Sequence, residues 1–112
     1  MSDISMPKPT RAHAEKRHAL ASGPDDALSA FSKAVFAPGA LDARTKQLIA
    51  VAVAHVTQCP WRIESHVKAA RREGATGAAI MEAIRGTAEM RAGAAFAHSI
   101  KALDLIDDPT AP

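Results

Sequence analysis

Apolar residues recur at helical spacing along most of this chain. The segment from Asp42 to Thr57 places an N-cap residue ahead of the apolar run Leu48 to Ala54, which predicts a helix buried on nearly all sides. A second helix is expected from Pro60 to Gly74, because proline suits the first turn of a helix and glycine commonly follows the last. Thr76 is then expected to cap a further helical region.

That further region carries two groups of apolar residues, Ile80, Ile84 and Ala88 in the first and Phe96, Ile100 and Leu103 in the second. The second group is expected to continue the apolar stripe of the first. Between them the pattern is interrupted at residues 91–93, which end in a glycine. We therefore expect the helix to bend or to break there.

The two ends of the chain are predicted to be tails. Residues 1–23 are punctuated by prolines and have room for one short helix from Thr10 to Ala21. The helical domain is expected to span residues 24–106, starting with a helix from Pro24 to about Phe36, and residues 107–112 form the C-terminal tail. Because we find neither a strand pattern nor an internal repeat, the predicted fold class is all-α.

Composition indicates a thin hydrophobic core. The chain has 112 residues, enough for one domain, and 26 of them are alanines, which bury little apolar area each. We therefore expect stacked helices that complete their core by self-association into a homo-oligomer.

Several classes of protein are excluded at this stage. The longest apolar run is too short to cross a membrane, and the N-terminal segment lacks the apolar stretch of a secretory signal. A formal charge of +2 is too small to predict nucleic-acid binding. A single cysteine cannot form an internal disulfide, so the expected location is the cytoplasm.

Candidate chemistry is concentrated in residues 55–66. Cys59 precedes Pro60 and is expected at the start of a helix, where unpaired N–H groups and the helix dipole favour a thiolate. His66 follows two turns later on the same face, and Arg62 lies between them near that face. From spacing alone, a small buried cysteine and a hydrogen-bonded core histidine are the more common interpretation, and the functional one stays open beside it.

The sequence also resembles a known family over residues 41–102. TKQLIAVAVAHVTQCPWRIESHVKAARREGAT and the later EAIRGTAEMRAGAAFAHS are similar to the alkylhydroperoxidase D-like branch of the carboxymuconolactone decarboxylase family. The resemblance implies a compact all-helical bundle that assembles as an oligomer, with a small-molecule active site near subunit contacts. No cofactor is expected.

The family pattern is a glutamate followed by C-x-x-C-x-x-x-H. Carried over by position, the first cysteine is Cys59 and the histidine is His66, whereas the second cysteine falls on Arg62 and the glutamate on Gln47. The resemblance thus implies catalytic roles for Cys59, His66 and Gln47. The resemblance also implies that one thiol reduces peroxide and that an external thiol regenerates it. This activity is expected to be impaired, because no second cysteine is present.

Three neighbouring side chains are assigned to substrate binding, namely Arg62, His55 and Trp61. For Arg62 a solvated surface position is an equal alternative, and for His55 a contact with the last carbonyls of its own helix is one. Trp61 suits a core or a subunit contact better than a substrate contact. No metal is expected, because His55, His66 and His98 lack the spacing of metal ligands.

Two other functions stay open. The first is a non-redox decarboxylase-like enzyme in which His66 is the general base and Arg62 holds a substrate carboxylate. The second is a non-catalytic binding or assembly module that keeps only the fold.

Overall fold

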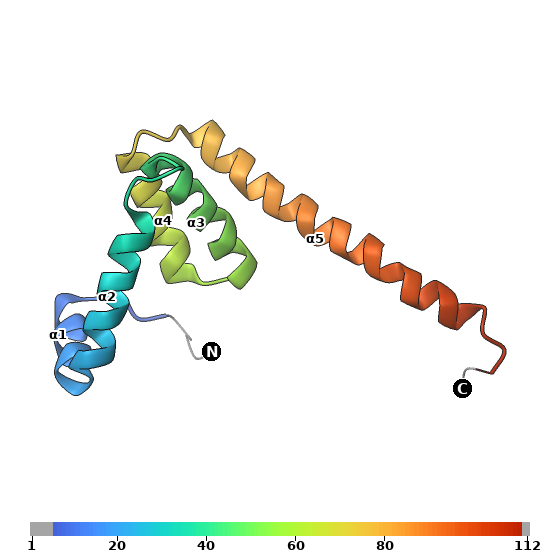
Figure 1. Ribbon diagram of the computed structural model, residues 1–112, viewed down its shortest axis with the longest axis horizontal. Helices are drawn as coiled ribbons and strands as arrows, with labels where there is room; N and C mark the ends of the chain where they lie inside the picture. The colour runs from blue at the N-terminus through green and yellow to red at the C-terminus, as the bar shows by residue number, and fades with distance from the viewer. Residues whose placement is uncertain (1–5, 111–112) are drawn as a thin grey trace, which may run out of the picture. The chain divides into compact units, whose positions relative to one another are not determined.

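The computed structural model describes residues 6–110, and this part of the chain is helical with no strand. Its helices are α1 (Arg11–Leu20), α2 (Ser22–Phe36), α3 (Ala43–Thr57), α4 (Pro60–Arg72) and α5 (Gly77–Ile106) (Figure 1). The all-α prediction is confirmed. The expectations for the outermost tail residues, 1–5 and 111–112, lie outside the described residues. The chain divides into two units, one up to Ala43 and one from Arg44 onward.

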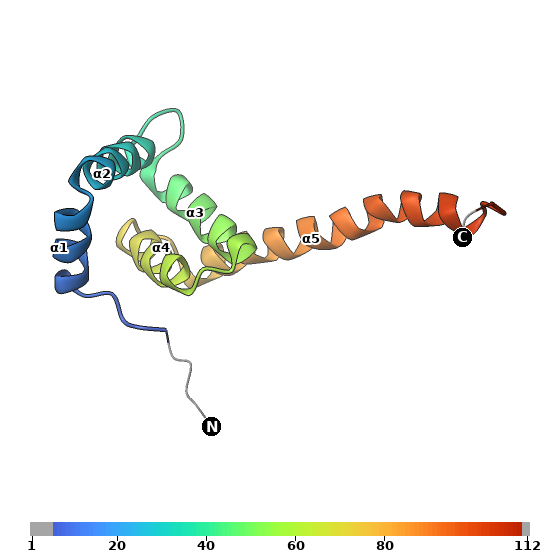
Figure 2. The same ribbon diagram turned by 90° about the horizontal axis from the view of Figure 1, so that it is seen from below.

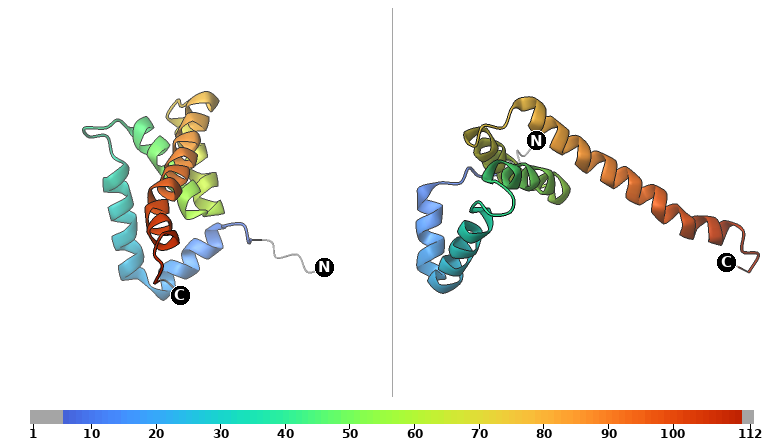
Figure 3. Two further views of the ribbon diagram at one scale, coloured as in Figure 1. Left: turned by 90° about the vertical axis from the view of Figure 1, so that its right-hand side faces the viewer. Right: turned by 45° about the horizontal axis from the view of Figure 1, so that its top comes forward.

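The first unit consists of α1 and α2, which form the two arms of a V (Figure 3). Thr10 caps α1, since its hydroxyl accepts a hydrogen bond from the His13 backbone N–H at 3.2 Å. His18 Nε2 lies 2.8 Å from a carboxylate oxygen of Asp26, which links the two helices. The short helix expected between Thr10 and Ala21 is therefore present, and α2 starts at Ser22, slightly before the predicted Pro24.

In the second unit, α3 and α4 lie side by side and run in opposite directions (Figures 1 and 2). Gly74 follows α4 with φ +87°, the left-handed conformation that glycine adopts without steric cost. Arg44, in the first turn of α3, donates a hydrogen bond to the Glu73 carbonyl at 3.0 Å and so caps the end of α4. The predicted end of this helix is confirmed.

The core of the second unit is small. Its buried cluster comprises Val51, Ala70, Ala75 and Ile80, with Leu48, Val67 and Ile84 packed against it. The expectation that α3 is buried on nearly all sides was wrong, because Ile49 and Val53 are 48% and 52% exposed. The helix packs against its neighbours through one face only, and its other apolar face is open to solvent.

The helix α5 corrects a second expectation. Thr76 caps it as predicted, its hydroxyl accepting from the Ala79 N–H at 3.1 Å, but the helix then continues through residues 91–93 without a break. Gly93 costs only about 1 kcal/mol relative to alanine in a helix, and its immediate neighbours are alanines, the best helix formers. The glycine therefore does not end α5.

Continuity places the second apolar group of α5 on a different face from the first. Phe96 follows the buried Thr87 by nine residues, or about two and a half turns, so the two side chains project from opposite sides. The second group thus does not continue the core-facing stripe, as we had expected from the sequence.

We call this second group, Phe96, Ile100 and Leu103, the distal stripe. Its side chains are 81%, 65% and 55% exposed. They belong to the part of α5 that extends past α3 and α4 (Figure 1). No helix within residues 6–110 combines the length and apolar character needed to cross a membrane.

Candidate functional site

The candidate site begins at the turn between α3 and α4, residues 57–60, which we call the α3–α4 corner. Gln58 has φ 56° and so occupies the left-handed region, as the residue after a helix often does. The backbone N–H of the next residue, Cys59, donates to the Ala54 carbonyl at 3.3 Å, which closes α3. Cys59 is also the N-cap of α4, with Pro60 in its first turn. One residue therefore ends one helix and begins the next.

Cys59 carries a free, half-buried thiol at this corner. Its side chain makes no capping hydrogen bond to the first turn of α4. The backbone N–H groups of such a first turn have no partner within the helix, and with the helix dipole they favour a negative charge at this end. The expected place of Cys59 at a helix start is confirmed.

His66 and Gln47 are brought together from α4 and α3. The distance from His66 Nδ1 to Gln47 Oε1 is 2.8 Å, and both side chains are half-buried. The amide oxygen can only accept, so Nδ1 carries the proton and donates it, and Nε2 is the basic nitrogen of the ring. The helices α3 and α4 thus hold the imidazole in one tautomer, with Gln47 where a carboxylate would lie in the related pattern.

The environment of His66 keeps its ring neutral. Burial lowers the pKa of His66 from its ordinary value of 6.5, and the positive charge of Arg62 lowers it further. Most of the rings therefore carry no proton on Nε2 at pH 7. A neutral imidazole with a fixed tautomer is suited to accept a proton.

Cys59, Arg62 and His66 follow one face of α4 in that order. Seven residues separate the first from the last, which brings both to nearly the same side of the helix, about 10 Å apart along its axis. Side chains on a helix lean toward its N-terminus, so the imidazole leans back toward the thiol. The remaining gap requires a bridging water or substrate, since direct proton transfer needs a contact of about 3 Å.

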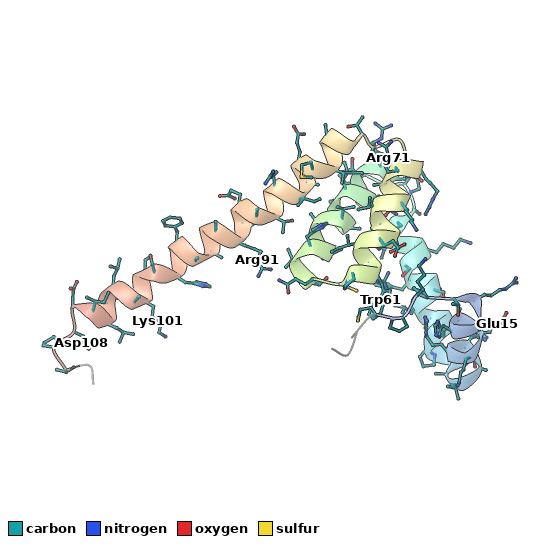
Figure 4. All side chains as sticks on the ribbon, turned by 180° about the vertical axis from the view of Figure 1, so that it is seen from behind. Glu15, Trp61, Arg71, Arg91, Lys101 and Asp108 are labelled. Carbon is teal, nitrogen blue, oxygen red and sulfur yellow. The ribbon has the colours of Figure 1, made fainter. Side chains whose placement is uncertain are left out.

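The other predicted binding residues differ in their surroundings. Trp61 lies in the first turn of α4 and is 36% exposed (Figure 4). The His55 ring binds within its own helix, because Nδ1 lies 2.7 Å from the Val51 carbonyl, which can only accept. That contact lies within its own helix, but Val51 is six residues before the end of α3 and is not one of the last carbonyls expected as the partner of His55. Among residues 6–110, no three metal-ligating side chains come together.

Two residues on α5 that the sequence analysis had not singled out contact α3. Thr87 is buried and donates its hydroxyl proton to the Ala52 carbonyl at 3.0 Å. Arg91 donates from Nη1 to the Val56 carbonyl at 3.3 Å. A signal for the second contact existed in the sequence, because Pro60, four residues after Val56, has no N–H to offer that carbonyl.

Comparison with known proteins decides the family. The sequence pattern of the carboxymuconolactone decarboxylase family matches residues 25–105. The chain belongs to this family. It is also 68% identical over 108 residues to "Uncharacterized protein 4 in cox locus" of Paracoccus denitrificans, a match that covers 96% of each chain. The all-helical fold is that of the carboxymuconolactone decarboxylase family, and membership supports an alkylhydroperoxidase D-like or decarboxylase-like activity.

Proposed function

We propose that this chain reduces peroxides through the single thiol of Cys59, and that an external thiol regenerates it. The observation that carries the proposal is the neutral His66, fixed by Gln47 on the helix that Cys59 begins. A base with a defined basic nitrogen and a thiol at a helix N-terminus are the two groups that peroxide reduction requires. In this proposal Arg62 occupies the place of the second cysteine of the family pattern.

The proposed reaction oxidises the Cys59 thiol by two electrons and passes its proton through His66. His66 Nε2 accepts the Cys59 thiol proton through a bridging water, and the thiolate attacks one peroxide oxygen. A sulfur–oxygen bond forms, the oxygen–oxygen bond breaks, and the departing alkoxide takes the proton from His66. Cys59 is left as a sulfenic acid, which one external thiol converts to a mixed disulfide and water. A second thiol then releases Cys59 as a thiol and leaves as a disulfide.

Arg62 and Trp61 are proposed to bind the substrate. Arg62 lies between the thiol and the imidazole along α4, where its guanidinium attracts an oxyanion or a substrate carboxylate. Trp61 offers a partly exposed apolar surface in the first turn. We also assign His55 to the rim of this site, where Nε2 is the ring nitrogen that its bond to Val51 leaves for a ligand.

The test is stoichiometric oxidation. With one equivalent of hydrogen peroxide and no added thiol, mass spectrometry is expected to find one oxygen added per chain, on Cys59. With a small thiol present, the same treatment is expected to give a mixed disulfide at Cys59. The Cys59→Ser variant serves as control and is expected to show neither product. Wild-type protein that remains unmodified while peroxide persists in solution would exclude this function.

We propose further that the chain is a homo-oligomer in which a second copy covers the distal stripe. Full burial of a large apolar side chain contributes about 1.5–3 kcal/mol, and the stripe leaves three such side chains more than half exposed. The same chain has a very small core, so its own buried residues provide little stability. A second copy supplies an identical stripe, which two-fold symmetry can place against the first.

An Ile100→Asp substitution is expected to dissociate this oligomer. It places a charge in the middle of the distal stripe, where association would have to bury it. Light scattering is expected to give a multiple of 11.7 kDa for the wild type and 11.7 kDa for the variant. His98→Asp is the matched control, because it adds the same charge on the other side of α5. A wild-type chain of 11.7 kDa at micromolar concentration would refute the proposal.

One observation favours a second candidate function. Arg62 lies close enough to His66 to lower its pKa, so a cation and a neutral base are neighbours. A small carboxylate held by Arg62 would place its adjacent C–H near this base, which is the arrangement of a non-redox decarboxylase-like enzyme. This candidate takes precedence if Cys59 resists peroxide and the wild type binds a small dicarboxylate that Arg62→Ala does not.

A further inference from the structure

Two hydrogen bonds connect α5 to the backbone of α3, one turn apart on each helix. Thr87 reaches the Ala52 carbonyl, in the interior of α3, at 3.0 Å. Arg91 reaches the Val56 carbonyl, in the last turn of α3, at 3.3 Å. Figure 4 shows Arg91 on the side of α5 nearest α3. The two contacts therefore attach α5 to different parts of α3, the first to its middle and the second to its end.

The Val56 carbonyl has no N–H donor from four residues later in the chain. In a continuing helix it would accept from the N–H four residues later, but that residue is Pro60, which has none. The neighbouring acceptor is already used, since the Ala54 carbonyl accepts from the Cys59 N–H and from the Thr57 hydroxyl. The guanidinium of Arg91 supplies the missing donor, and its positive charge also suits the negative end of the α3 dipole.

The geometry points to Arg91 as a positioning residue for Cys59. We propose that its bond to Val56, three residues before the thiol, holds the α3–α4 corner in the conformation that aligns Cys59 with His66. The part of this inference that concerns reactivity rests on the proposed peroxidase function. Arg91 itself is not a catalytic residue, because it acts on the backbone and through Cys59.

The backbone of the corner gives a reason for such a restraint. Gln58 lies in the left-handed region at φ 56°, a conformation that costs a side-chain-bearing residue about 1 kcal/mol or more. Such a residue keeps this conformation only when surrounding contacts fix it. The Cys59 N–H, directly after Gln58, is bonded to Ala54, and the Val56 carbonyl, two residues before Gln58, is bonded to Arg91. These two contacts restrain the backbone on both sides of Gln58.

The first measurement concerns the backbone and needs no enzyme activity. Arg91→Met keeps the apolar part of the side chain but removes every donor. Amide hydrogen exchange at Cys59 is expected to be about fivefold faster in this variant, the change that corresponds to one lost hydrogen bond. Exchange at Ala75, whose N–H donates to Ala70 at the far end of α4, is expected to stay unchanged. Arg91→Lys retains a donor and is expected to restore part of the protection.

The second measurement is the rate at which stoichiometric peroxide oxidises Cys59. Arg91→Met is expected to lower this rate by up to about fivefold, since losing one hydrogen bond lowers the ratio of aligned to misaligned corners by that factor, and Arg91→Lys is expected to recover part of it. Thr87→Val removes the other α5–α3 bond and keeps the side-chain shape, so it controls for weakened packing of α5. Arg85→Met controls for the loss of an exposed arginine from the same helix. Both controls are expected to react at the wild-type rate.

The outcomes separate this inference from the proposed function. Unchanged exchange at Cys59 in Arg91→Met would overturn it, and so would an equal loss of rate in Thr87→Val, which would indicate general packing. If no chain reacts with peroxide but exchange rises at Cys59 as expected, the proposed function fails while the restraint on the corner is supported. Recovery of both rate and protection by lysine would support the inference in full.

Discussion

Replacing His66 by glutamine is expected to slow the oxidation of Cys59 by peroxide about 100-fold, the usual contribution of a positioned acid–base group. Glutamine retains a donor for the Gln47 amide oxygen but offers no basic nitrogen of comparable strength. The rate is measured under single-turnover conditions with no added thiol. His98→Gln is the control, since it removes an exposed imidazole of α5 that has no part in the proposed site.

The pH dependence gives an independent check on the same residue. His66 accepts a proton only when neutral, and its pKa lies below 6.5 because of burial and the Arg62 charge. The wild-type rate is therefore expected to keep more than half of its value at pH 6.5 and to fall further as the pH passes through the lowered pKa. His66→Gln is expected to lack this fall. An equal loss of rate in His98→Gln would contradict the assigned role of His66. A decrease in rate at low pH that persists in His66→Gln would contradict it as well.

A second large effect is expected from Arg62→Cys, which would place a thiol at the position of the family's second cysteine. Residues three apart at a helix start have side chains about 5–6 Å apart at Cβ, within reach of a disulfide after small adjustment. The wild type is expected to consume one peroxide per chain when no thiol is supplied and then stop. Without thiol, the variant is expected to stop as a disulfide between positions 59 and 62. With dithiothreitol, which also regenerates the wild type, the variant is expected to turn over faster because its disulfide forms within the chain.

Adding Gln47→Glu is expected to raise the rate of this variant about tenfold more. A carboxylate at position 47 would accept the Nδ1–H of His66 with a negative charge and so stabilise the protonated ring in the transition state. Loss of the Arg62 cation and gain of this carboxylate both raise the pKa of His66. The decrease in rate that accompanies protonation of His66 should therefore occur at higher pH. A double variant that forms the disulfide yet gains no turnover would indicate a site adapted to another reaction.

Features set by local chemistry could be predicted from the sequence. Thr76, Gly74 and Cys59 occupy the helix ends expected for them, because a cap depends on residues within one turn. The face shared by Cys59, Arg62 and His66 also follows from helix periodicity alone. The hydrogen bond between Gln47 and His66 joins two helices, so spacing within one helix could not indicate it, and the family resemblance assigned both residues only to one catalytic set.

Features that depend on packing could not be predicted in this way. The apolar run of α3 gave no sign that Ile49 and Val53 face solvent, because burial depends on which neighbours are present. The Gly93 region was expected to interrupt α5, but the surrounding alanines outweigh one glycine. The contact of Arg91 with the end of α3 joins residues 35 positions apart, and no local pattern brings them together.

Because α5 is uninterrupted, the angle about its axis between the core-facing side and the distal stripe is fixed. Each residue advances a helix by about 100°, so one inserted residue between Thr87 and Phe96 would turn the distal stripe by that angle relative to the core-facing side. Two inserted residues would turn it by about 200° and place both surfaces on the same side. The number of residues in this segment, more than their identity, therefore determines the direction in which the second surface is presented.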